Sequence, residues 1–141
     1  MRVALGVAIP LAVADLAVKR FAATPEWAYH DRSLSWLALC LFLLAGLVLL
    51  LRIPSMLVPP AAGILAAGVL GNAISAASSY HFAVPNPLIV TTSNAVIAFN
   101  LADVFVMVGL VALVPVLARE LIVHRSTIDA HVRRHRRRRT S

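Results

Sequence analysis

Charged side chains are scarce in this sequence. Asp, Glu, Lys and Arg make up 13% of the 141 residues, whereas a soluble globular domain has about 25%. Hydrophobic residues make up 60% of the chain, and its mean hydropathy is +0.86. This composition argues against a soluble domain and indicates an integral membrane protein.

Cysteine is almost absent. The single cysteine, Cys40, excludes an internal disulfide and a metal cluster made of several cysteines. It lies inside an apolar run, so we predict that it is a small packing residue. Two histidines, His30 and His81, could join Asp103 around a metal ion. Their spacing matches no metal motif, and we predict neither a metal nor a cofactor.

Four long apolar runs make up most of the sequence. They cover residues 3–22, 35–51, 56–78 and 97–123, and each is close to the roughly 20 residues that cross a bilayer as a helix. The alternation of a membrane β-barrel is missing. The sequence therefore predicts an all-α polytopic membrane protein, with a four-transmembrane-helix bundle in residues 1–123 and a basic tail in residues 124–141. Asp15, Lys19 and Arg20 interrupt the first run, which favours a retained helix over a cleaved signal peptide.

The basic residues are distributed unevenly along the chain. Ten of the thirteen Lys and Arg lie at the N-terminus, in the second connection or near the C-terminus, and the third connection has none. The positive-inside rule then predicts that both termini are cytoplasmic. The arginine-rich run 131–139 is typical of nucleic-acid binding as well. Because it follows a membrane helix, we predict that it binds anionic lipid headgroups and no nucleic acid.

Asp103 is the only side chain of fixed charge between Arg52 and Arg119, and burying a carboxylate near hydrocarbon is costly without a partner. Polar residues at helical spacing form three pairs: Asp15 and Lys19, Asn72 and Ser75, Asn100 and Asp103. Each pair shares one helix face, and the topology places all three near the outer membrane surface. They form either a functional site or polar contacts that hold the helices together.

Two of these pairs lie in recognisable motifs. Gly71-Asn72-Ala73-Ile74-Ser75 and Phe99-Asn100-Leu101-Ala102-Asp103 resemble the two signatures of signal peptidase II, the lipoprotein signal peptidase, which read approximately G-N-x-x-D and F-N-x-A-D. The spacing of Asp15 and Lys19 is similar to the D-x-x-x-K of that family's first helix.

The resemblance implies a four-helix intramembrane aspartic protease of the bacterial plasma membrane, which removes signal peptides from lipid-modified prolipoproteins. In such an enzyme one aspartate acts as base and the other as acid on a shared water. Asp103 then matches the second catalytic aspartate and Ser75 takes the position of the first. Supporting roles fall to Asn72, Asn100, Asp15 and Lys19.

The sequence departs from the family at its acidic positions. Ser75 has no carboxyl group to share a proton with Asp103, and the family's V-x-D-F element is matched only by Val84-Pro85-Asn86-Pro87. We therefore predict a divergent, catalytically impaired relative that keeps a groove for a membrane lipid, a lipid-modified prolipoprotein or another acylated peptide. Two alternatives stay open. One is an active peptidase with a replacement acid from Asp15, Glu26 or Asp31, and the other is a non-enzymatic four-helix membrane subunit.

Overall fold

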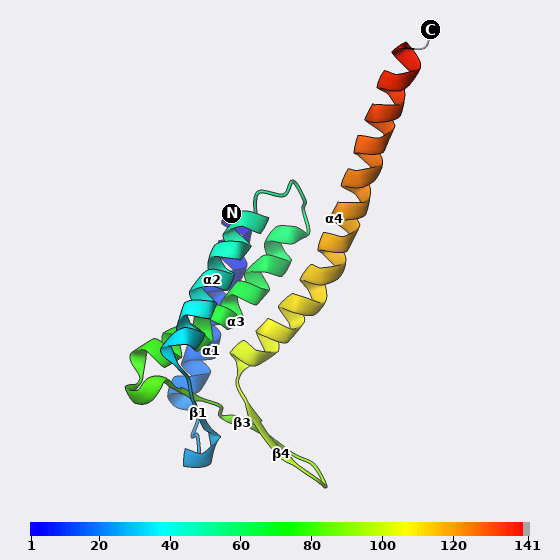
Figure 1. Ribbon diagram of the computed structural model, residues 1–141. Coiled ribbons are helices and arrows are strands. Elements are labelled where there is room, and N and C mark those ends of the chain that lie inside the picture. Colours follow the sequence, from blue (N-terminus) through cyan, green and yellow to red (C-terminus); the bar gives the residue numbers. More distant parts are fainter. Residues whose placement is uncertain (140–141) are drawn as a thin grey trace.

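A computed structural model of the protein describes the backbone of residues 1–139 and the side chains of residues 1–125. Four helices dominate the described chain: α1 (Arg2–Phe21), α2 (Leu34–Leu50), α3 (Val58–Ser78) and α4 (Leu101–Arg139). Short 3-10 turns, η1 (Glu26–Ala28) and η2 (Tyr80–Phe82), precede strands in the first and third connections. The prediction of a mostly helical protein is confirmed (Figure 1).

The connections contain β-structure, so the prediction of an all-α fold was wrong in this respect. Strand β1 (Tyr29–Asp31) pairs antiparallel with β2 (Ala83–Pro85), and β3 (Leu88–Thr91) pairs antiparallel with β4 (Val96–Phe99). These strands have three or four residues each, too few to give a clear alternating pattern. Residues 97–99, expected to begin the fourth helix, belong to β4.

Two helices in the described chain are long and apolar enough to cross a membrane on their own. They are α3 and the segment Leu101–Arg125 of α4. Helix α2 is apolar but has only 17 residues, and α1 carries Asp15, Lys19 and Arg20 near its end. The structure thus supports a membrane protein, while the number of crossings stays a prediction.

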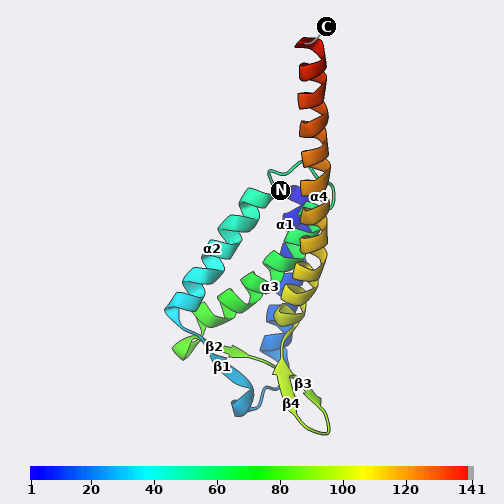
Figure 2. The same cartoon turned by 45° about the vertical axis from the view of Figure 1, so that its right-hand side comes forward.

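The two ends of the molecule differ in structure. The N-terminus and the α2–α3 connection lie at one end, and the four strands lie at the other (Figures 1 and 2). Helix α4 continues past the other helices, because its 39 residues extend for roughly 58 Å at 1.5 Å per residue. It begins four residues later than expected and continues through the predicted tail to Arg139. The side chains of residues 126–141, and with them the predicted headgroup contacts, lie outside the described part.

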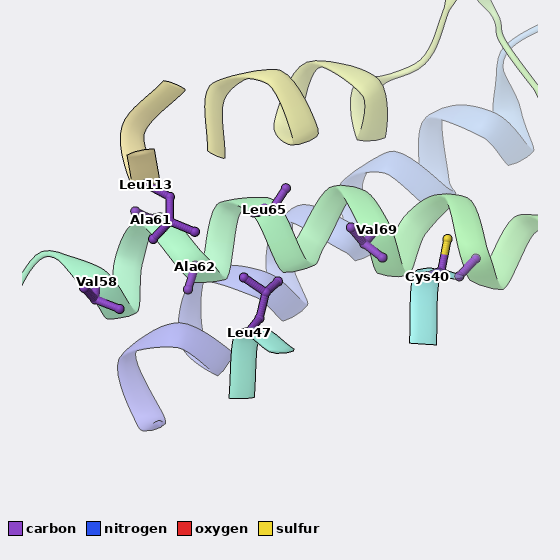
Figure 3. Packing of buried hydrophobic residues seen from close by; sticks show 9 residues of the cluster. Cys40, Leu47, Val58, Ala61, Ala62, Leu65, Val69 and Leu113 are labelled. Atoms are coloured by element: carbon purple, nitrogen blue, oxygen red, sulfur yellow. The ribbon is translucent and has the colours of Figure 1, made fainter. Parts of the chain in front are cut away.

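Helix α3 occupies the centre of the bundle and packs mainly against α4 and α1. Small residues allow this approach: a Cβ on Gly63 would lie 2.7 Å from the Ala4 carbonyl oxygen, and one on Gly109 would lie 2.5 Å from the Leu65 nitrogen. Figure 3 shows the buried side chains of α3 between α2 and Leu113 of α4. Cys40 belongs to this apolar cluster, as its surroundings in the sequence predict.

Candidate functional site

Asp15 and Lys19 form a buried ion pair within α1. The Lys19 Nζ lies 2.7 Å from the Asp15 Oδ2, because residues four apart share a helix face. Asp15 is fully buried and Lys19 is 8% exposed. Desolvating two such ions costs several kcal/mol each unless further hydrogen bonds satisfy them. Both residues find those bonds on other helices.

The ion pair connects α1 to α3 and α4. Lys19 donates to the Oδ1 of Asn72 at 2.7 Å, and the Nδ2 of Asn72 donates to the Oδ1 of Asp103 at 2.9 Å. Asp15 accepts a hydrogen bond of 2.8 Å from the backbone N–H of Ala102. A Cβ on Gly71 would lie 2.5 Å from the Asp15 Oδ2, so this network depends on a glycine in α3.

Asn100 and Asp103 bond each other reciprocally at the start of α4. The Asn100 Oδ1 accepts from the Asp103 backbone N–H at 3.0 Å, and the Asp103 Oδ2 accepts from the Asn100 backbone N–H at 3.1 Å. This arrangement is a capping box, which satisfies backbone donors that the first helical turn leaves free. Each oxygen of Asp103 therefore accepts one hydrogen bond from the protein and keeps a second lone pair.

The third connection reaches the same network through Asn86. The Asn100 Nδ2 donates to the Asn86 Oδ1 at 2.5 Å, and the Asn86 Nδ2 lies 2.7 Å from the His30 Nδ1 in β1. Asn86 is 1% exposed. The sequence did not single it out as a site residue, although it occupies the acidic position of the V-x-D-F-like element. Nothing in the sequence predicted the contact with His30.

Ser75 lies apart from these contacts. Its hydroxyl donates to the Gly71 carbonyl of its own helix at 2.9 Å, and no hydrogen bond to Asp103 occurs within residues 1–125. The other five predicted site residues are joined in one network. Glu26 and Asp31, the loop acids considered as replacements, are exposed and make no ion pair in that part of the chain.

A cavity of about 310 Å³ lies beside Asp103, between α2, α3 and α4. Its polar lining comes from Arg32, Asn72 and Asp103. The other lining residues have mainly apolar side chains or, for glycine, none. They are Trp36, Leu39, Cys40, Leu43, Gly68, Val69, Val106 and Met107. A mainly apolar wall with a few placed polar groups is the usual character of a small-ligand site.

Arg32 is held at this cavity by two contacts. Its guanidinium carbon lies 5.0 Å from the centre of the Trp36 ring, within the range of a cation–π interaction. Its backbone N–H donates to the Phe82 carbonyl at 3.1 Å. The Arg32 Nε is buried and has no hydrogen-bond partner among the residues whose side chains are described.

The site presents a carboxylate, an amide and a cation around an apolar space, and these groups suit an amphiphilic ligand. Among the residues with described side chains, no three His, Cys, Asp or Glu gather in a way that would hold a metal ion. Hydrolysis by an aspartyl pair needs two neighbouring carboxyl groups. Of the described carboxylates, only Asp103 lines the cavity.

Comparison with known proteins supports the fold. No model of a known protein family matches the chain, and no curated protein matches it. The structure is similar to that of a bacterial membrane enzyme determined by the in meso method at 2.3 Å resolution, with a TM-score of 0.64. The match has 16% sequence identity and covers 84% of this chain and 88% of the other. The protein therefore shares its fold with a bacterial membrane enzyme.

Proposed function

We propose that this protein is a signal peptidase II-like protein that binds a lipid-modified peptide beside Asp103 and is impaired in cleaving it. In this proposal it spans the bacterial plasma membrane several times, with both termini in the cytoplasm. The fold shared with a bacterial membrane enzyme and the Phe99–Asp103 motif support it. The observation that carries it is the Asp103 carboxylate at the wall of an apolar cavity, where no other carboxylate of residues 1–125 is part of the lining.

The chemistry of the cavity favours an acylated peptide as ligand. Hydrocarbon chains gain free energy by leaving water for apolar walls, at about 25 cal/mol per Å² buried. Peptide and ester carbonyls accept hydrogen bonds, and Arg32 brings a guanidinium group to the lining of this cavity. Asp103, with lone pairs to spare, accepts from a peptide N–H.

Impaired cleavage follows from the residues around Asp103. Its network leads to amides, Asn72 and Asn100, and through Asn100 to Asn86. An amide cannot exchange a proton as the second acid of an aspartyl pair does. Asp15 is the other acid in the described network, but it is bound to Lys19 and to the Ala102 N–H.

The test is binding and cleavage of a fluorescent diacylglyceryl-modified peptide by the protein in proteoliposomes. We expect saturable binding and no product by mass spectrometry. Asn86→Asp places a carboxylate one amide away from Asp103, and we expect it to produce more cleavage than Ser75→Asp. Asp31→Asn, a change in the exposed first connection, is the control and should leave binding unchanged.

Two results would overturn the proposal. Cleavage by the unmodified protein that is lost in Asp103→Asn would establish an active peptidase with a replacement acid. If the folded protein does not bind the peptide, the cavity beside Asp103 is not a binding groove for it.

A second candidate is a non-enzymatic membrane subunit in which the polar network only holds helices together. The capping box of Asn100 and Asp103 favours it, because this carboxylate stabilises the start of α4 without any ligand. In that case Asp103→Asn lowers stability, and no acylated peptide binds to either form.

A further inference from the structure

A second cavity lies at the end of the bundle opposite the strands. It has a volume of about 610 Å³ and lies between the α2–α3 connection and α4. Its lining consists of Leu50, Arg52, Ile53, Pro54, Leu117, Glu120, Leu121, Val123 and His124. No residue of the Asp103 site takes part in it.

Two charged residues line this cavity, Arg52 and Glu120, and they differ in their contacts. The Glu120 carboxylate is already bound, accepting from the Ser55 hydroxyl at 2.9 Å and from Arg119 at 3.1 Å. The Arg52 and His124 side chains are exposed and make no hydrogen bond or ion pair within residues 1–125. Arg52 is therefore a cation without an ion-pair partner in the described part of the chain.

The remaining lining suits hydrocarbon. Leu121 is 71% exposed, and Leu50, Ile53, Pro54 and Leu117 extend the apolar surface between α2 and α4. A free phosphate would use only the cation. A molecule with a phosphate at one end and acyl chains at the other would use both parts. Apolar segments flank this cavity on α2 and α4, so its acyl chains can lie in the same layer as those helices.

We propose that this cavity binds one anionic phospholipid, with its phosphate on Arg52 and His124 and an acyl chain on Leu117 and Leu121. The site is discrete and separate from any attraction of lipids by the arginine-rich C-terminus. It does not depend on the function proposed for the Asp103 cavity.

The experiment is native mass spectrometry of the full chain with phosphatidylglycerol or phosphatidylcholine. We expect one retained phosphatidylglycerol with higher affinity than phosphatidylcholine. One basic residue near a membrane surface contributes about 1 kcal/mol, so Arg52→Ala should weaken binding by roughly fivefold. Arg52→Lys should keep most of it. Arg2→Ala is the matched control, because Arg2 is exposed at the same end and lines no part of the cavity.

A second variant tests the acyl contact. Leu121→Asp removes apolar surface and adds a negative charge, and we expect weaker retention with an unchanged melting temperature. Equal affinity for both lipids, equal effects of Arg52→Ala and Arg2→Ala, or full competition by soluble glycerol phosphate would overturn the proposal.

Discussion

The side-chain amide of Asn72 lies between Lys19 and Asp103, accepting from the lysine at 2.7 Å and donating to the carboxylate at 2.9 Å. Both ends of the amide are in use, so its orientation is fixed by its neighbours. Through this one side chain, α3 links a cation on α1 to an anion on α4. Asn72 is the side chain of α3 that connects the ion pair of α1 to Asp103 in this polar network.

We expect Asn72→Leu to destabilise the protein by about 1–3 kcal/mol, since it leaves two polar partners without their hydrogen bonds. The free energy of unfolding can be measured by titration with denaturing detergent in mixed micelles. Asn94→Leu is the control, because Asn94 is exposed in the connection between β3 and β4 and surface changes usually stay within about 0.5 kcal/mol. Equal effects of the two substitutions would contradict a central role for Asn72.

The buried ion pair predicts a large cost for losing one partner. Lys19→Met leaves the Asp15 charge buried without its cation, and we expect a loss of about 3–5 kcal/mol. The more exposed pair of Arg119 and Glu120 provides the comparison, since Arg119→Met should cost at most about 1 kcal/mol. A double variant, Asp15→Asn with Lys19→Met, should recover part of the loss. No recovery would argue against the pairing of the two charges.

Glycines in two environments predict opposite effects on stability. Gly71→Ala forces a methyl group against Asp15 and Ala102, and overpacking of this kind costs about 1–3 kcal/mol. Gly46→Ala places its methyl group in open space within α2 and should stabilise that helix by up to about 1 kcal/mol. Thermal unfolding followed by tryptophan fluorescence distinguishes the two. A harmless Gly71→Ala would show that α1 and α3 are farther apart than described.

The Asp103 cavity predicts that bulk at its lining blocks the ligand. Met107 is 62% exposed and lines the cavity, while Val111, one turn later on α4, is 70% exposed and does not. We expect Met107→Trp to weaken binding of the acylated peptide at least about tenfold, which corresponds to 1.4 kcal/mol. Val111→Trp should leave binding unchanged, and fluorescence titration measures both. Binding that tolerates Met107→Trp would place the ligand elsewhere.

The helices and most of the polar network could be predicted from the sequence because both depend on local spacing. Apolar runs gave the four helices, with ends shifted by a few residues in the first three. The spacing of Asp15 and Lys19, and that of Asn100 and Asp103, placed each pair on one helix face, where the structure has them in contact.

What could not be predicted depends on pairing between distant segments. The strands are too short to show a pattern, and β1 pairs with β2 across more than 50 residues of sequence. The contact of Asn86 with His30 follows from that pairing. Ser75 shows the opposite error, since helical spacing put it on the face of Asn72 but could not show that its hydroxyl bonds the Gly71 carbonyl.

The ion pair of α1 is synthesised before its partners on the later helices. Lys19 and Asp15 emerge from the ribosome 53 and 87 residues ahead of Asn72 and Ala102, their partners on later helices. Until those helices arrive, the two side chains have only each other, and their spacing of four residues allows the contact within a lone helix. In the predicted four-helix topology α1 enters the bilayer first, and the ion pair cancels the charges of Asp15 and Lys19 until their later partners are made.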